Sequence, residues 1–559
     1  MKTITDLIPF FAAGAAALAA SGCSQDSKQQ QTPNVVFILA DDLGWGDLSC
    51  YGQQRFSTPN IDALARDGIR FTQCYSGTTV SAPSRSCLIT GTHSGHTAIR
   101  GNKPAKSIVI PEGQYPLPAG TQTIFHDFKA AGYRTGAFGK WGLGFIGTSG
   151  DPSEQGVDDF FGYNCQTLAH SYYPDHLWDN DRKVILEDNV DEIPYGEGTY
   201  SADLIHSEAL EFLRASVGEG KPFFMWYPTT IPHAELIVPE DSIITRLRGQ
   251  YPEEPFAGVD QGMPRFRTGG YCSQQYPHAT FAAMVTRLDV YVGQIVDELK
   301  RLGVYDNTII MFASDNGPHL EGGADPDFFD SNGPWRGYKR DLYEGGIRVP
   351  MIIRWPGHIA PGTETDFVCS FWDMMPTFRE ILSSSSSGAD PSLTSRTSSS
   401  EASSSSGASS SSEASSSSEA SDASSSPSSS DASSTGEFAS VVEPWTDLDG
   451  ISLLPLLEGD TDAQQGHDFL YFEFAERNAR ASRIGPWKLI NQGLNSGHDW
   501  YELYNLDDDP SEVSDLLGHY CPADGDSLPE AYASLYSELL DVMQREHVAN
   551  TIFPLFDGE

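Results

Sequence analysis

The chain has 559 residues and a formal net charge of −42, because 77 Asp and Glu residues outnumber 35 Lys and Arg residues. This charge excludes general binding of nucleic acid or of an anionic membrane through the overall field, since a strongly acidic body repels phosphate polymers. With 39% hydrophobic and 11% aromatic residues, the chain has enough apolar side chains for a sizeable core and is not disordered as a whole.

The N-terminus has the features of an export signal. Residues 1–22 begin with Lys2, continue as an apolar run too short to span a bilayer, and end in small residues before Cys23. This pattern resembles a bacterial lipoprotein signal, in which Cys23 would carry a lipid anchor; a plain secretory signal is the alternative. We therefore expect an exported protein, periplasmic or at the cell surface, with residues 23–33 as a tether to the membrane.

The following part of the chain alternates predicted strands and helices. A continuous apolar run at residues 34–40 is typical of a strand buried on both faces. Further strands are predicted at residues 69–75, 133–138, 222–227, 308–313 and 349–355, and helices at 58–68, 83–88, 123–131, 200–215 and 278–302. This alternation favours an α/β fold over residues 34–382, with a large, mostly parallel sheet sandwiched between helices.

Residues 383–436 differ in composition from the rest of the chain. They are more than half serine and have too little apolar area to offset the entropy of ordering, so we predict a disordered serine-rich insert. Beyond it, short strands at 469–474, 487–489 and 500–506 and a helix at 528–548 predict a smaller C-terminal subdomain over residues 437–559. We expect this subdomain to be an antiparallel sheet with a closing helix.

Seven cysteines follow Cys23, and none belongs to a Cys-x-x-Cys pair. A zinc site made of thiolates is therefore not expected. Isolated buried thiols are the simplest interpretation, with one or two disulfides as the alternative.

Acidic and amide side chains follow two of the predicted buried strands. Asp41 and Asp42 end the first strand, and Asp315 and Asn316 come directly after the strand at 308–313. Ligand sites of such sheets gather at the carboxyl ends of strands, and a set of oxygen donors suits Ca²⁺ or Mg²⁺. Asp and Asn also end strands in ordinary turns, so each pair alone has a structural interpretation as well.

Ser81 begins the segment Ser-Ala-Pro-Ser-Arg, in which Pro83 suits the first turn of a helix. Ser81 would lie at a helix N-terminus, where anionic oxygens are stabilised, and Arg85 one turn later could reach the same oxyanion. Together with Thr90 and Gly91, this segment resembles the signature Cys/Ser-x-Pro-Ser-Arg-x-x-x-x-Thr-Gly of the formylglycine-dependent sulfatases. That family belongs to the alkaline phosphatase superfamily, and the serine form is the bacterial type.

Other segments resemble the same family in the same order along residues 34–382 and 448–550. They include Asp41-Asp42, Gly-Lys140-Trp, Pro-His233, Asp315-Asn316-Gly, Gly-Tyr-Lys339 and Glu502-Leu-Tyr-Asn-Leu-Asp507. The resemblance implies an alkaline-phosphatase-like fold and a sulfuric ester hydrolase that acts on a sulfated carbohydrate.

The resemblance also implies a nucleophile and a cation. A maturase would oxidise Ser81 to formylglycine; one hydroxyl of the aldehyde hydrate would attack sulfur, and the other would later expel sulfate. Ca²⁺, with Mg²⁺ as the alternative, would be held by Asp41, Asp42, Ser81, Asp315 and Asn316.

Four further side chains would take part in catalysis by the same resemblance. Arg85, Lys140 and Lys339 would neutralise the sulfuryl oxygens, and His233 would donate a proton or a hydrogen bond to the leaving oxygen. Outside this context, each lysine has a simpler interpretation as a surface charge and His233 as a loop histidine.

One position departs from the family pattern. Many members have a histidine where this chain has Gly142, and that histidine is thought to help release sulfate. His170 is the nearest candidate along the chain to replace it, which we state as a hypothesis. Arg100, His170 and His319 lie in segments that combine aromatic, basic and acidic residues, and we predict that they contact the sugar.

Two other functions stay open. A phosphodiesterase or phosphonate hydrolase of the same superfamily would share the sheet and the nucleophile. A catalytically weak, sulfoglycan-binding lipoprotein is suggested by Gly142 and the serine-rich insert. The acidic charge favours a short or terminal sulfated sugar or oligosaccharide over a long polyanion, and no nucleic acid is expected as a partner.

Overall fold

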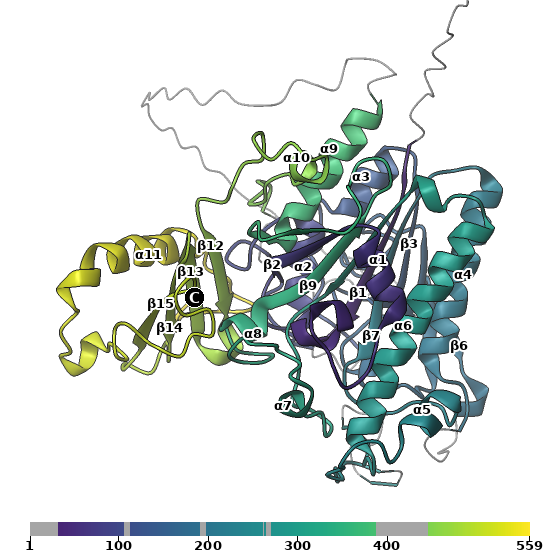
Figure 1. The fold of residues 1–559 in the computed structure, drawn as a ribbon, viewed down its shortest axis with the longest axis horizontal. Helices are drawn as coiled ribbons and strands as arrows, with labels where there is room; N and C mark the ends of the chain where they lie inside the picture. The colour runs from purple at the N-terminus through teal and green to yellow at the C-terminus, as the bar shows by residue number, and fades with distance from the viewer. Residues whose placement is uncertain (1–31, 105–111, 190–196, 261, 264–269, 387–444) are drawn as a thin grey trace, which may run out of the picture. The chain divides into compact units, whose positions relative to one another are not determined.

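The computed structural model describes residues 32–104, 112–189, 197–260, 262–263, 270–386 and 445–559 (Figure 1). The predicted signal, Cys23, most of the tether and nearly all of the serine-rich insert lie outside these residues, so the predictions about them stay predictions. Among the helices that are described, none combines the length and the apolar character that a membrane span requires.

Eleven strands form the large sheet. They are β1 (Asn34–Asp41), β2 (Ile69–Tyr75), β3 (Arg134–Lys140), β4 (Asp159–Tyr163), β5 (His176–Asp179), β6 (Arg182–Ile185), β7 (Phe223–Pro232), β8 (Thr308–Ser314), β9 (Arg348–Arg354), β10 (Thr363–Thr365) and β11 (Cys369–Ser370). The order is β10-β2-β9-β8-β1-β7-β3-β4-β5-β6, with β11 also paired to β2. β1 pairs in parallel with both β7 and β8, whereas β9 runs antiparallel to β2 and β8.

The helices cover both faces of this sheet. They are α1 (Pro59–Arg66), α2 (Ser81–Thr90), α3 (Ile124–Ala130), α4 (Ser201–Glu219), α5 (Ser242–Leu247), α6 (Pro277–Arg301), α7 (Pro326–Phe329), α8 (Glu344–Ile347) and α9 (Met374–Ser386). Every residue of β1 is buried, and alternate side chains face opposite layers. Val36 and Ile38 pack with α1, α4 and α6, whereas Val35 and Phe37 pack with α2, α3 and α9. The predicted sandwich is confirmed, and its two-sided burial explains why the central strands are continuously apolar.

A second, smaller sheet follows the insert. It consists of β12 (Leu470–Phe474), β13 (Ala479–Ile484), β14 (Trp487–Gln492) and β15 (Trp500–Asn505), which are antiparallel in chain order; α10 (Leu454–Leu457) precedes it and α11 (Ala533–Arg545) follows it. Leu539 and Val542 of α11 pack against Leu489 and Leu503 of the sheet. The predicted antiparallel sheet with a closing helix is thus confirmed.

Two details differ from the sequence prediction or complete it. α9 continues to Ser386, so the first four residues of the predicted insert belong to a helix. All seven cysteines among the described residues are free, so the alternative of disulfides is not realised there. Not all of them are isolated, however, because Cys369 of β11 lies opposite Cys74 of β2.

Three buried charges connect the two sheets, and we call Glu344, Lys488 and Glu512 the join cluster. The Lys488 Nζ lies 2.9 Å from an oxygen of Glu344 and 2.8 Å from an oxygen of Glu512. Tyr75 of β2 donates a hydrogen bond to Glu344 at 2.6 Å. Burial and the charge of Glu344 raise the pKa of Glu512 to about 7, although Lys488 opposes the shift. Lys488 thus holds two carboxylates that come from different parts of the chain.

Candidate active site

The carboxyl ends of two neighbouring parallel strands place four oxygen-bearing side chains together. Ala40 of β1 lies opposite Ser314 of β8, so Asp41 and Asp42 emerge beside Asp315 and Asn316. All four side chains are fully buried. The backbone N–H of Asp42 donates to Asp315 Oδ1 at 3.0 Å, and Asn316 Nδ2 donates to Asp42 Oδ1 at 2.7 Å. The strand ends therefore bring together the four residues that the sequence placed there.

Ser81 is the first residue of α2 and faces the same group. Its hydroxyl donates to Asp41 Oδ1 at 3.0 Å. Lys140, the last residue of β3, donates from Nζ to Asp41 Oδ2 at 2.8 Å and to Ser81 Oγ at 3.3 Å. Burial lowers the pKa of Lys140, although the charge of Asp41 opposes the shift. A helix start and two strand ends thus meet at the Ser81 hydroxyl.

Arg85 lies one turn further along α2 and is fully buried. Its Nε and Nη2 donate to Asp315 Oδ2 at 2.9 and 2.8 Å, and its Nη1 donates to the backbone carbonyl of Lys140. Burial alone would raise the pKa of Asp41, but the charges of Lys140 and Arg85 hold it below its ordinary range. Burial and the charge of Asp41 raise the pKa of Asp315 to about 6. In this part of the site, the buried carboxyl groups of Asp41, Asp42 and Asp315 thus outnumber the two buried cations.

Lys339 and His233 complete the group from another direction. Lys339 Nζ donates to Asp42 Oδ2 at 2.7 Å and to Glu321 Oε2 at 3.1 Å, and it lies 3.1 Å from His233 Nε2. Because an ammonium group only donates, His233 Nε2 accepts here, and Nδ1 donates to the carbonyl of Ala234. Burial and the charge of Lys339 lower the pKa of His233 well below its ordinary value, so the ring is neutral.

The two histidines predicted to contact the sugar lie beside His233. The ring of His170 stacks on that of His233 with centroids 5.1 Å apart, and the ring of His319 does so at 5.7 Å. His319 is held by the backbone, since its Nε2 lies 3.2 Å from the Pro232 carbonyl and its Nδ1 accepts from the N–H of Glu321 at 3.1 Å. Burial lowers the pKa of His170 well below its ordinary value, and the charges of Lys140 and Lys339 add to the shift. The buried Nδ1 of His170 has no hydrogen-bond partner within the described part of the chain.

Gly142 occupies the position at which many family members have a histidine. Its backbone conformation favours glycine. Its φ of 75° lies in the left-handed region, and a Cβ there would lie 2.4 Å from Nε2 of Gln166. That Gln166 nitrogen is buried and without a hydrogen-bond partner among the described residues. A larger side chain at this position would therefore meet both backbone strain and Gln166.

Arg100 is the one predicted substrate contact that the structure does not bring to this group. Its guanidinium donates to Glu473 Oε1 at 2.6 Å, to the Val548 carbonyl at 2.6 Å and to the carbonyls of Thr97 and Gly95. Its side chain is 2% exposed, and all three of its nitrogens are engaged. The geometry therefore corrects our expectation: Arg100 has a structural role in holding the C-terminal part of the chain to the loop after α2.

Glu321 is a member of the site that the sequence analysis did not select. It contacts Lys339 and Arg340, and Lys339 lowers its pKa although burial opposes the shift. The sequence feature that could have indicated Glu321 is its position two residues after His319, in a segment that combines histidine with acidic residues.

The donor set fits a hard divalent cation. Asn316 Oδ1 is buried and lacks a hydrogen-bond partner among the residues that the structure describes. It lies on the same side chain whose nitrogen binds Asp42, next to the carboxylates of Asp41 and Asp315. Oxygen donors with surplus negative charge are what Ca²⁺ and Mg²⁺ prefer.

The chain is similar in sequence to proteins of the sulfatase family. The family model described as sulfatase matches residues 33–384. The chain is 31% identical over 417 residues to the N-acetylgalactosamine-6-O-sulfatase of Bacteroides thetaiotaomicron, covering 65% of this chain and 76% of that protein. It is 31% identical over 373 residues to the N-acetylgalactosamine-6-sulfatase of Rattus norvegicus, covering 62% of this chain and 61% of that protein. The match to the rat protein thus spans less than two thirds of its length.

A solved structure shows the same fold. The crystal structure of Ps i-CgsB in complex with k-i-k-neocarrahexaose superimposes with a TM-score of 0.64 at 24% identity, covering 93% of this chain and 94% of that one.

Proposed function

The chain belongs to the sulfatase family, and from that premise we propose that it hydrolyses sulfate esters of a sulfated carbohydrate at the Ser81 site. The observation that carries the proposal is the convergence of Ser81, oxygen donors and buried cations at one edge of the sheet. The names of the relatives make a 6-O-sulfated N-acetylgalactosamine, free or at the end of an oligosaccharide, the first substrate to test.

We propose that Ser81 acts as formylglycine, because an unmodified serine hydroxyl is a weak nucleophile. Asp41 supports this role: its pKa is held low, so it stays ionised at neutral pH and accepts a hydrogen bond from a hydroxyl at position 81. Formation of the aldehyde requires a maturase and removes two hydrogens. The peptide that contains Ser81 should then be about 2 Da lighter than its sequence mass.

A divalent cation, Ca²⁺ or else Mg²⁺, would be held by the oxygens of Asp41, Asp42, Asp315, Asn316 and the modified Ser81. Such an ion supplies positive charge and Lewis acidity to a sulfuryl group. The orphaned Asn316 Oδ1 supports this assignment, since a buried amide oxygen without a partner is costly unless a ligand satisfies it.

The buried cations would bind and orient the substrate. Arg85, Lys140 and Lys339 are fixed by carboxylates before substrate arrives, so little reorganisation is needed when negative charge develops on the sulfuryl oxygens. His233 is neutral and accepts from Lys339, so a proton for the leaving oxygen would come from Lys339 or from His233 once it is protonated.

His170 remains our candidate for the proton transfer that a histidine at position 142 would perform. Its stacking on His233 and its unpartnered Nδ1 support the hypothesis. The test is sulfate release by His170→Ala in single-turnover and steady-state assays. Full release in both would remove His170 from the mechanism.

The experiment that tests the proposed function is a panel of regiodefined sulfated monosaccharides, with matched phosphate esters and a phosphonate ester as controls. We expect sulfate release from at least one sugar, with kcat/KM for the phosphate and phosphonate esters lower by about 100-fold or more. Faster cleavage of the phosphorus esters would assign the chain to the hydrolase alternative. Glycan binding without turnover, despite verified formylglycine, would assign it to the binding-protein alternative.

We also propose that the protein is exported and anchored through Cys23. The residues before Cys23 support this proposal, and the mature N-terminus is the measurement. A lipidated Cys23 is expected, and an unmodified protein released into the medium would contradict the anchor.

A further inference from the structure

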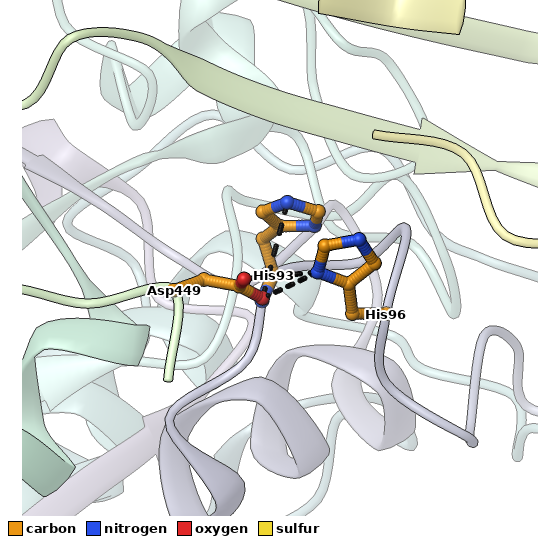
Figure 2. A group of neighbouring side chains, drawn as sticks. All are labelled: His93, His96 and Asp449. Atoms are coloured by element: carbon orange, nitrogen blue, oxygen red, sulfur yellow. Dashed lines mark hydrogen bonds and ion pairs between the residues drawn. The ribbon is translucent and has the colours of Figure 1, made fainter. Parts of the chain in front are cut away.

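A second group of ligand-type side chains lies where the loop after α2 meets the C-terminal part of the chain. His93 and His96 come from that loop, and Asp449 comes from the segment that follows the serine-rich insert. Figure 2 shows both imidazole rings beside the Asp449 carboxylate. His96 Nδ1 lies 2.9 Å from Asp449 Oδ2, and His93 Nε2 lies 3.8 Å from the same oxygen.

Glu546, directly after α11, lies at the edge of this group. Its Oε2 lies 3.2 Å from His93 Nε2 and 3.9 Å from His96 Nε2, which is not the nitrogen that faces Asp449. Three donor atoms, one each from His93, His96 and Asp449, therefore lie within 4.8 Å of one another, and these three side chains are at most 13% exposed.

The surrounding backbone fixes the direction of these donors. The N–H of Gly95 donates to His93 Nδ1 at 3.2 Å, so Nε2 faces the carboxylates and carries the ring proton, which it donates to Glu546. Binding of a metal at Nε2 would release this proton. Asp449 is held at both ends, because its Oδ2 accepts from the N–H of His93 at 2.8 Å and its own N–H donates to the Gly91 carbonyl at 3.0 Å. Trp445 stacks on the ring of His96 with centroids 3.8 Å apart. The contacts with Gly95, Gly91 and Trp445 thus add to the hydrogen bonds within the group in fixing its orientation.

The separations match those between ligands of a small tetrahedral ion. Metal–ligand bonds of about 2.0 Å give ligand-to-ligand distances of about 3.3 Å in a tetrahedron. The two separations from imidazole nitrogens to Asp449 Oδ2, 2.9 and 3.8 Å, lie on either side of that value, and all three donor atoms lie within 4.8 Å of one another. Mixed imidazole and carboxylate donors favour Zn²⁺, whereas a hard ion such as Ca²⁺ takes oxygen donors alone.

We propose that His93, His96 and Asp449 form a second metal site that binds Zn²⁺ or a similar borderline dication. The ion would fasten two segments together: the loop after the helix that begins with Ser81 and the chain after the insert. Because binding occurs only when these segments are folded together, it would stabilise the folded state. This site is separate from the Ser81 site and does not depend on the proposed activity.

The test uses the full chain, stripped with a chelator and titrated with Zn²⁺. We expect the wild type to bind one zinc that His96→Gln lacks, with affinity in the variant at least about 100-fold weaker, since even changes outside the ligand shell cost 10–100-fold. Zinc should raise the melting temperature of the wild type and not that of His96→Gln.

The matched control is His498→Gln. His498, Cys521 and Asp524 also lie close together, but His498 and Asp524 are largely exposed, with side chains 69% and 53% accessible. This variant should keep the same high-affinity zinc as the wild type. Loss of that zinc in His498→Gln and its retention in His96→Gln would overturn the assignment.

A readout on the wild type covers the case in which His96→Gln fails to fold. Crystals of the wild type soaked in zinc should show an anomalous peak at the zinc edge between His93, His96 and Asp449. No peak there, or stabilisation that follows pH but not zinc, would mean a hydrogen-bonded network alone and would overturn the proposal.

Discussion

The Ser81 site and the join cluster both bury several charges, but they balance them differently. In the join cluster, one ammonium group lies within 3 Å of two carboxylates that come from different parts of the chain. In the Ser81 site, the charges also come from distant parts of the chain, namely strand ends, α2 and the segment between β8 and α8, but polar atoms of Asn316 and His170 are left without partners among the described residues. The ion pairs of the join cluster stabilise the contact between the two sheets. The unpartnered polar atoms of the Ser81 site are available to bind a ligand.

Ser81→Ala tests the catalytic side of this comparison most strongly. We expect kcat to fall by about 10⁴-fold, because the nucleophile is removed, while the melting temperature changes little. Ser86→Ala is the control, since Ser86 is buried on the same helix but bonds to Thr97. A sulfatase assay decides, and activity of Ser81→Ala within tenfold of the wild type would show that position 81 is not the nucleophile.

Lys488→Met tests the structural side. Removing the cation leaves Glu512 buried without its ion-pair partner and leaves Glu344 paired only with Arg348 among the described residues, at 3.2 Å, so the unfolding free energy should fall by about 3–5 kcal/mol. Below its melting temperature, the variant should retain near-normal kcat. Lys129→Met is the control: its ion pair with Asp158 is 51% exposed on the lysine side and should be worth under about 1 kcal/mol. Equal losses in denaturant titrations of the two variants would contradict the assignment of Lys488.

Glu512→Gln tests whether the join cluster makes the stability of the protein depend on pH. The pKa of Glu512 is raised from 4.5 to about 7, so its contribution to stability is complete below pH 4.5 and is lost as pH rises through 7. The wild type should therefore lose up to about 3 kcal/mol relative to Glu512→Gln between these limits. Parallel stability curves for the two proteins from pH 5 to pH 8 would argue against this titration.

Asn316→Leu is expected to have the smallest effect, and it tests the role of the unpartnered Asn316 Oδ1. It removes Oδ1, which bonds to no described residue, and the Nδ2 donor to Asp42. We expect divalent-cation affinity to fall by about tenfold or more, with a change in unfolding free energy near 1 kcal/mol. Cation titration followed by activity measures the first quantity and denaturant titration the second. An unchanged cation affinity would exclude Asn316 as a ligand.

Sequence reasoning identified the central strands of the large sheet, because most of them are apolar runs. It missed β4, which is buried but short, the partly exposed hairpin of β5 and β6, the two- and three-residue strands β11 and β10, and β13. The β13 sequence contains Arg480, Ser482 and Arg483, which are buried only because distant residues bind them; Ser482, for example, donates to a carbonyl of α11 at 2.8 Å. No apolar alternation marks such a strand.

Contacts between residues that are distant in the sequence also limit prediction of the site. Asp41 and Asp315 followed from strand ends, and Arg85 from the helix start, since those positions depend on local structure. Lys140, Lys339 and His233 came only from resemblance to a family. Arg100 was misplaced because its partner, Glu473, lies 373 residues away in the chain, and nothing local indicates that pairing.

The anchoring of the chain on both sides of the serine-rich insert has a practical consequence. Before the insert, the described chain ends with α9. After the insert, it lies beside the beginning of α9, where the N–H of Ile451 donates to Asp373 Oδ1 and the N–H of Leu453 donates to Thr377 Oγ1. Closing a longer connection between fixed ends costs only about 0.6 kcal/mol for each doubling of its length. This junction is therefore a permissive position, at which evolution can lengthen or shorten the chain and an engineer can graft a label or a second module.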